Sequence, residues 1–157
     1  MPVRLTSTIA VVFFLYSVES CFSQSAQLNL SSAETDAGGT IQLEISLDAP
    51  SNSQPASLQW TLQVPPAFKV VSVLGTKNIS TAGKTLVCNK ATCLVYGVNR
   101  AAIPNGSISV IKIKVDQDTV GKQHIQISKA LASSPDGKAI PLLPGNALVT
   151  VSSRARR

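Results

Sequence analysis

The sequence predicts an all-β domain built as a sandwich of two sheets. Apolar and polar residues alternate with a period of two through most of the chain, which is typical of strands that bury one face. Clusters rich in Gly, Pro, Asn and Asp interrupt the alternation about every 8 to 12 residues, a spacing that favours sandwiches and barrels. Beyond the first residues, no helical periodicity extends over a dozen residues.

Two segments show the alternation most clearly. Residues 40–47 (TIQLEISL) place their isoleucines and leucines on one face, and residues 57–64 (SLQWTLQV) place Trp60 inward between leucines. Pro65 and Pro66 cannot donate to a strand ladder, so they end the second segment. In the same way we expect about nine strands, namely 27–30, 40–47, 57–64, 68–75, 85–88, 93–98, 107–115, 123–128 and 147–151.

Turn sequences separate these strands: DAGG, PNG, SPDG and LPGN each combine residues that favour tight turns. One strand breaks its own pattern. Within 107–115 the apolar parity switches between Val110 and Ile111, so we expect a bulge there or burial on both faces.

The first 23 residues resemble an export signal. Arg4 supplies a positive charge, residues 5–18 form a short apolar run, and small residues allow cleavage after Ser20 or Ser23. An uncleaved anchor stays an alternative, and so does lipidation of Cys21, which lies in an imperfect lipoprotein box. The expected organisation is a leader at 1–23, one domain at 24–152 and a basic tail at 153–157.

The formal net charge is +6, and it is unchanged by loss of the leader, which removes Arg4 and Glu19 together. The positive residues are dispersed along the strands, as on a solvated surface. We therefore expect no nucleic-acid partner, and membrane contact only through the leader or a lipid on Cys21. The protein is expected to be secreted or held at the cell surface.

Two cysteines, Cys88 and Cys93, remain in the mature domain. Their spacing is not that of a C-x-x-C redox motif, and no further Cys or His lies close enough in sequence to complete a zinc site. In a hairpin with a four-residue loop the two cysteines lie opposite each other, which favours a cross-strand disulfide in an oxidising compartment. A metal or redox role stays the alternative.

Sequence motifs for catalysis and cofactors are weak. AGKT at 82–85 lacks the earlier glycine and the following helix of a phosphate loop, and DQDTVG at 116–121 lacks the later ligands of a calcium loop. We expect ordinary loops there, with calcium as the alternative for 116–121. The one histidine, His124, faces outward with no partner arrangement. The sequence therefore predicts no enzyme and no cofactor.

Three asparagines, Asn29, Asn78 and Asn105, match the glycosylation pattern. We interpret them as chance matches in turns rich in Asn and Ser.

Several stretches together resemble the cohesin-like family of exported bacterial proteins, related in fold to cellulose-binding sandwiches. They are AETDAGGTIQLEISLDAP, PASLQWTLQVPPAFKVVSVLG, TCLVYGVNRAAIPNGSISVIKIKV and SSPDGKAIPLLPGNALVTV. The resemblance covers roughly residues 27–151 and implies a nine-stranded jelly-roll sandwich. It also implies binding of a dockerin-like protein through one outer sheet face, without catalysis.

The leading hypothesis is therefore an exported module that binds another protein. Two alternatives are a carbohydrate-binding module of a polysaccharide-degrading system and a structural subunit of a surface or secretion apparatus. The cysteine hairpin is apolar on both faces, so we expect that a loop covers it or that it presents an apolar patch to a partner. By resemblance to the family, binding is expected on the outer faces of the Trp60 strand and the cysteine hairpin. The candidate partner-binding residues there are Gln59, Thr61, Gln63, Lys90, Tyr96 and Arg100.

Overall fold

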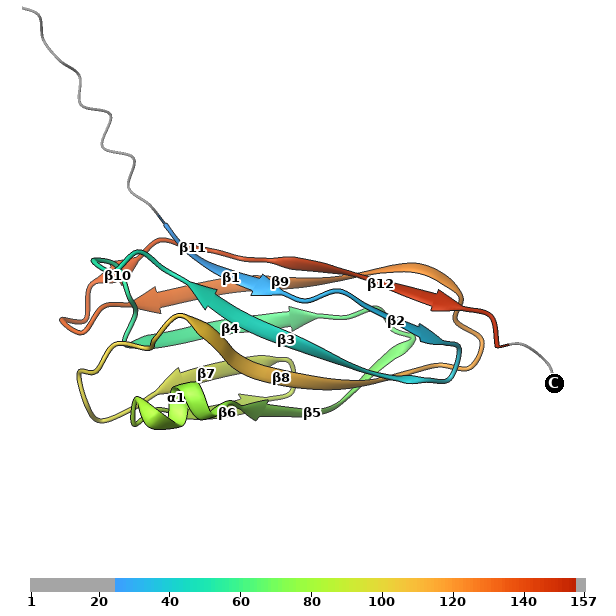
Figure 1. Cartoon of the computed structure of the whole chain (residues 1–157), viewed down its shortest axis with the longest axis horizontal. Coiled ribbons are helices and arrows are strands. Elements are labelled where there is room, and N and C mark those ends of the chain that lie inside the picture. The colour runs from blue at the N-terminus through green and yellow to red at the C-terminus, as the bar shows by residue number, and fades with distance from the viewer. Residues whose placement is uncertain (1–24, 155–157) are drawn as a thin grey trace, which may run out of the picture.

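The computed structural model describes residues 25–154 and is an all-β sandwich, as predicted (Figure 1). Its elements in chain order are β1 (Ala26–Leu30), β2 (Ala33–Asp36), β3 (Thr40–Asp48), β4 (Ser57–Gln63), β5 (Phe68–Gly75), α1 (Lys77–Thr81), β6 (Thr85–Asn89), β7 (Thr92–Tyr96), β8 (Gly106–Val115), β9 (Gly121–Ser133), β10 (Ala139–Ile140), β11 (Leu142–Leu143) and β12 (Asn146–Ser152).

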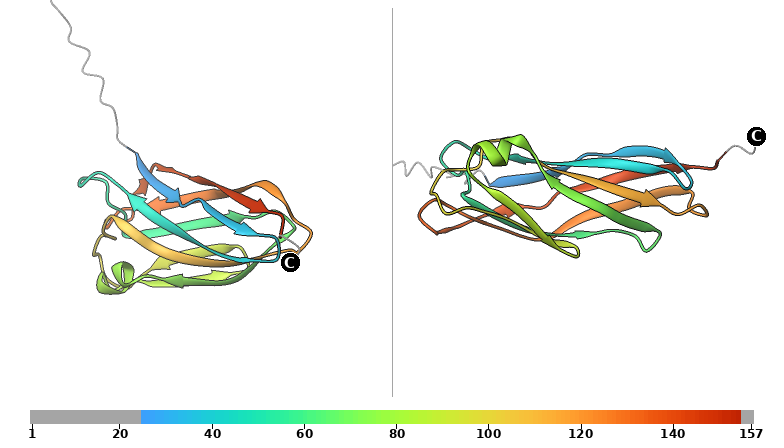
Figure 2. Two further views of the ribbon diagram at one scale, coloured as in Figure 1. Left: turned by 45° about the vertical axis from the view of Figure 1, so that its right-hand side comes forward. Right: turned by 90° about the horizontal axis from the view of Figure 1, so that it is seen from below.

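These strands form two sheets that pack face to face (Figures 1 and 2). Sheet A has the order β11-β1-β3-β8-β5, and sheet B has the order β2-β12-β9-β4-β7-β6, with β10 paired to β9. Most neighbours are antiparallel, while β1 and β11, and β2 and β12, pair in parallel. Many neighbours lie far apart in sequence because the chain crosses between the sheets, as in a jelly roll.

The core fills the space between the sheets and follows the alternation of the sequence. In β3 the apolar residues at alternate positions are buried, and in β4 Trp60 is fully buried between Leu58 and Leu62. Burial of such side chains contributes roughly 1.5–3 kcal/mol each, so the alternation itself selects which face of each strand turns inward. The core is continuous across both sheets.

The expected irregularity of β8 is present, but two residues earlier than predicted. The register against β3 shifts between Ile45 and Ser46, so the extra residue on β8 is Ile108. Both Ile108 and Ser109 are fully buried, because the bulge turns two successive side chains inward. Sequence parity placed the change too late because Ser109 is polar although it is buried, and Val110 is apolar although it pairs with the exposed Glu44 on the outer side.

Other strand ends differ from expectation for local reasons. The strand expected at 93–98 is β7 and ends at Tyr96, and the one expected at 123–128 is β9 and continues to Ser133. The sequence pattern missed the short elements β2, β10, β11 and α1, which are too short to show periodicity. Gly75 allows α1 to pack closely, since a Cβ there would lie 2.7 Å from the Cδ1 atom of buried Ile79.

The predicted leader at 1–23, with Cys21, lies outside the described residues, as does most of the basic tail. Within the described part, no helix is long and apolar enough to span a membrane.

Candidate functional site

The outer face of sheet B carries a row of side chains that crosses four strands, with exposed apolar residues on three of them. Val87 on β6 pairs with Leu94 on β7, Leu94 pairs with Gln59 on β4, and Gln59 pairs with Leu131 on β9. The exposed fractions of the three apolar side chains are 45% for Val87, 36% for Leu94 and 61% for Leu131. We call these four residues the docking row.

Leu131 joins this row because β9 contains a bulge. Gln59 pairs with Leu131 while Thr61 pairs with Ser128, so Lys129 and Ala130 together oppose the single residue between Gln59 and Thr61. Lys129 has φ +48°, a left-handed conformation that non-glycine residues rarely adopt. Bulges re-aim side chains, and this one turns Leu131 outward in the second half of β9. The sequence pattern missed Leu131, although the break of alternation in SKALAS was a signal for it.

The hairpin of β6 and β7 forms one end of the row and is closed by a disulfide. Cys88 and Cys93 pair directly, with a Cα–Cα distance of 4.1 Å, and their sulfurs are bonded. The strands continue to Asn89 and Thr92, so the loop contains two residues rather than the expected four. Lys90 begins this turn with φ +55°, which suits a two-residue hairpin.

The apolar outer face of the hairpin is uncovered. Val87, Leu94 and Tyr96 are all exposed, Tyr96 by 44%. Of the two expected outcomes, a covering loop or an open apolar patch, the structure has the open patch. Thr61 and Thr92 continue the same face beside the row, with their hydroxyl oxygens 3.0 Å apart.

The six candidate residues do not form one cluster. Gln59, Thr61 and Gln63 lie on β4, and Tyr96 ends β7, so these four share the outer face of sheet B. The turn between β6 and β7 carries Lys90, and the loop that follows β7 carries Arg100, so the two cations lie beyond opposite ends of the hairpin.

The part of this face that holds the docking row carries charge of one sign, whereas the exposed carboxylates of Glu34 and Asp36 lie on β2, at the far edge of the same sheet. The strands β4, β6, β7 and β9 contain no Asp or Glu, whereas β9 carries the exposed residues Lys122 and Lys129.

Lys84, which directly precedes β6, forms a hydrogen bond to the loop after β7. Its side chain is only 5% exposed, and Nζ donates to the backbone oxygen of Asn99 at 3.0 Å. The Asn99 amide in turn donates to the backbone oxygen of Ala82 at 3.0 Å. Burial lowers the pKa of Lys84 because it penalises the charged amine. The segment 82–85 is thus a loop and the beginning of a strand, as expected.

Two of the glycosylation-like asparagines have structural contacts. The Asn105 side chain makes two hydrogen bonds to the backbone of Ala49. Its Oδ1 accepts from the Ala49 N–H at 2.9 Å, and its Nδ2 donates to the Ala49 carbonyl oxygen at 2.8 Å. Asn78 donates to the backbone oxygen of Pro104 at 3.0 Å. These contacts tie β3 and α1 to the loop before β8.

Groups suited to catalysis or metal binding do not converge in the described part of the chain. His124 is exposed on β9, and Asp116 and Asp118 are exposed in the turn between β8 and β9. Among residues 25–154 there is no group of three His, Cys, Asp or Glu side chains able to hold a metal ion.

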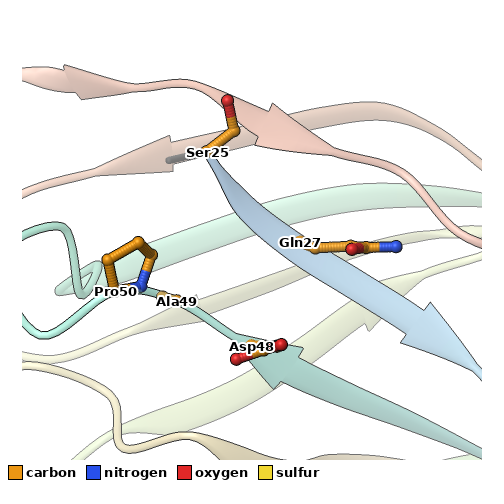
Figure 3. Close-up of a pocket in the computed structure, with 5 residues that line it drawn as sticks. All are labelled: Ser25, Gln27, Asp48, Ala49 and Pro50. Atoms are coloured by element: carbon orange, nitrogen blue, oxygen red, sulfur yellow. The ribbon is translucent and has the colours of Figure 1, made fainter. Parts of the chain in front are cut away.

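A shallow hollow of about 360 Å³ lies where β1 begins, beside the end of β3. Its lining residues include Ser25, Gln27 and Asp48, and Figure 3 shows these three side chains pointing in different directions. Because the polar groups do not converge on one point, we assign no ligand to it.

No protein-family model matches this sequence, and no curated protein matches it either. Solved structures do match its fold. A non-cellulosomal cohesin from the hyperthermophilic archaeon Archaeoglobus fulgidus aligns with a TM-score of 0.67 at 16% identity, over 83% of this chain and 94% of that one. The chain has a cohesin-like fold.

Two further cohesin structures support this assignment. A type I cohesin–dockerin complex from Clostridium thermocellum, Coh-OlpA-Doc918, matches with a TM-score of 0.65 at 14% identity, over 82% of this chain and 99% of that one. The seventh ScaB type I cohesin from Pseudobacteroides cellulosolvens matches with a TM-score of 0.63 at 13% identity, over 84% and 95%. At these identities the likeness concerns the fold.

Proposed function

We propose that this protein is an exported, non-catalytic module that recognises another protein through the outer face of sheet B. The observation that carries the proposal is the docking row, in which the exposed apolar residues Val87, Leu94 and Leu131 align with Gln59 across four strands. Exposed apolar side chains gathered in a patch are typical of interaction sites, whereas scattered ones are ordinary.

The fold supports a dockerin-like partner. A structural neighbour is seen in complex with a dockerin, and a β-sandwich that offers one sheet face needs no rearrangement to bind. The Gln59 amide would lie within the row, between Leu94 and Leu131, while Thr61 and Gln63 would add polar groups on one side of it along β4. Tyr96 would serve as an aromatic anchor. Lys90 and Arg100 would reach a partner only where it extends past the ends of the hairpin.

Export is the second part of the proposal. It is supported by the leader-like residues 1–23 and by the Cys88–Cys93 disulfide, since such bonds persist in oxidising compartments. N-terminal sequencing of the native protein tests it, and a chain that begins at Cys21 or Gln24 is the expected result. A native chain that retains Met1 would contradict export with cleavage.

The binding proposal is tested by affinity capture from the native culture fluid with the protein and its Leu94→Arg variant. Burying an arginine against an apolar partner surface should cost more than about 2 kcal/mol, the scale of an interface hot spot, and so weaken binding at least tenfold. We expect a defined protein to be captured by the unmodified chain and lost with Leu94→Arg.

Gln42→Arg is the matched control. It introduces the same side chain at an exposed position of β3, on the outer face of the opposite sheet. Capture should survive this change. If Leu94→Arg and Gln42→Arg retain the same proteins as the unmodified chain, the outer face of sheet B is not the binding surface.

A carbohydrate-binding role is the second candidate, and the exposed ring of Tyr96 is the observation in its favour. The other two aromatic residues in the described part, Trp60 and Phe68, are buried, so Tyr96 would stack on a sugar alone. Retardation by cellulose, xylan or chitin in affinity electrophoresis that disappears in Tyr96→Ala would favour this role over protein binding.

A further inference from the structure

Asn105 and Gly106 form an Asn–Gly pair at the point where the chain enters β8. Of the seven asparagines in the sequence, Asn105 is the one that a glycine follows. Because glycine has no Cβ, the backbone nitrogen of the residue after such an asparagine is unhindered and can attack the side-chain amide. An Asn–Gly pair is therefore the dipeptide in which an asparagine most readily loses its amide.

The fold uses both residues of this pair. Gly106 has φ +114°, a backbone conformation that residues with a side chain rarely adopt. The Asn105 side chain holds the residue that follows β3, since it accepts from the Ala49 N–H at 2.9 Å and donates to the Ala49 carbonyl oxygen at 2.8 Å. Ala49 is only 4% exposed, so its backbone groups have little access to water as an alternative partner. The chemically labile pair thus lies where the structure also depends on it.

We propose that Asn105 is a site of spontaneous deamidation and that its two hydrogen bonds to Ala49 set the rate. The Gly106 backbone nitrogen forms a bond to the Asn105 Cγ atom, and the bond between Cγ and Nδ2 breaks. Nδ2 leaves as ammonia, which carries away the proton from the Gly106 nitrogen. Water then opens the resulting five-membered imide at one of its two carbonyl groups, which gives aspartate or isoaspartate.

The hydrogen bonds protect the amide as long as the loop before β8 stays in place. They hold both ends of the amide group, whereas the attack requires Cγ to turn toward the Gly106 nitrogen. Asn78 adds a second restraint, because its Nδ2 donates to the backbone oxygens of Pro104 at 3.0 Å and of Asn105 at 3.3 Å. Deamidation should therefore follow opening of this loop. Two ordinary hydrogen bonds correspond to a rate about thirtyfold lower in the folded chain than in the unfolded chain.

The reaction removes the contact that protected the amide. An ionised aspartate has no proton to donate, so a carboxylate at position 105 would direct an oxygen at the carbonyl oxygen of Ala49. Isoaspartate would in addition lengthen the main chain by one methylene group directly before β8. Either product should weaken the attachment of the end of β3 to the loop before β8. Each modified molecule would then keep a less stable fold, which limits the lifetime of the domain.

The rate is tested by incubating the full chain at mildly alkaline pH, either folded or unfolded in urea. Peptide mapping by mass spectrometry locates each conversion, because a carboxyl group is heavier than the amide that it replaces. In the unfolded chain Asn105 should convert faster than every other asparagine. In the folded chain its conversion should be about thirtyfold slower.

Variants test the protection and its consequence separately. Asn78→Ala removes the bonds to Pro104 and Asn105, so it should speed the conversion of Asn105 in the folded chain and leave the rate in the unfolded chain unchanged. Its thermal unfolding midpoint reports whether it is folded at the incubation temperature. Asn52→Ala is the matched control, because Asn52 is exposed and contacts its neighbour Ser53, and it should change neither rate. Asn105→Asp reproduces one product and should lower the thermal unfolding midpoint.

Several outcomes would overturn the proposal. They are faster conversion of another asparagine in the unfolded chain, equal conversion of Asn105 in the folded and unfolded chains, or equal rates in folded Asn78→Ala and the unmodified protein. An Asn105→Asp variant as stable as the unmodified protein would overturn the proposed loss of lifetime. The site lies where the loop before β8 meets the end of β3, in sheet A, so it can fail independently of the docking row in sheet B.

Discussion

Reduction of the Cys88–Cys93 disulfide should lower the free energy of unfolding by about 2 kcal/mol. The bond joins residues five apart in sequence, and closing so short a loop removes little entropy from the unfolded chain. The chain-entropy relation gives about 2 kcal/mol for a loop of this size at 25 °C. This loss is small compared with the stabilisation from burial of the core side chains, so the sandwich should remain folded when the disulfide is reduced.

The loss should be concentrated in one strand. β6 is one of the two edge strands of sheet B and pairs only with β7, so it has no second neighbour to hold it when the disulfide opens. We expect faster amide hydrogen exchange in β6 after reduction, with little change in the central strands β3 and β9. Such local opening at an edge is typical of the less stable parts of a fold.

The assay is urea unfolding with and without reductant. For a domain of this size the slope is about 1–3 kcal/mol per molar urea, so the midpoint should fall by roughly 1 M. The Cys88→Ser/Cys93→Ser variant is the control and should not respond to reductant. Equal midpoints in both conditions, in a protein whose intact mass rises by two hydrogens on reduction, would refute the reasoning.

Three further predictions concern single residues. Asn105→Ala should destabilise by about 2 kcal/mol in urea unfolding, because it removes both hydrogen bonds to Ala49, whereas the exposed Asn52→Ala should cost under about 0.5 kcal/mol. Lys129→Gly should raise the thermal midpoint, since glycine adopts φ +48° without strain. A midpoint lower than that of the parent would contradict this. The free energy of unfolding, measured relative to that of Lys84→Met, should rise as the pH approaches 10.5. Burial lowers the pKa of Lys84 in the folded protein, so the unfolded chain binds this proton more tightly, and the folded state gains stability as the proton is lost. A difference in unfolding free energy between the protein and Lys84→Met that stays constant over that pH range would contradict a lowered pKa of Lys84.

The hairpin of β6 and β7 links the disulfide to the proposed binding face. Its outer face contributes the exposed side chains of Val87, Leu94 and Tyr96, and the Cys88–Cys93 bond joins its two strands. Reduction should therefore weaken partner capture as well as the stability of β6.

The sequence by itself determined the fold class and most of the strands. Alternation with a period of two is a local property, so it can be read along β3 or β4 without knowledge of their neighbours. The same rule correctly placed Trp60 in the core and His124 on the surface, and it identified the apolar outer face of the cysteine hairpin. Proximity in sequence was also sufficient to predict the opposition of Cys88 and Cys93.

Only the tertiary structure decided what lies beside these residues. Leu131 joins Leu94 in one row because the bulge at Lys129 shifts the register of β9 against β4, and register between strands distant in sequence is not encoded in either strand alone. The buried Trp60 Nε1 atom likewise has no hydrogen-bond partner among residues 25–154, and this depends on which side chains the opposite sheet brings near it. Alternation fixes the face of a side chain, whereas packing between distant segments fixes its neighbours.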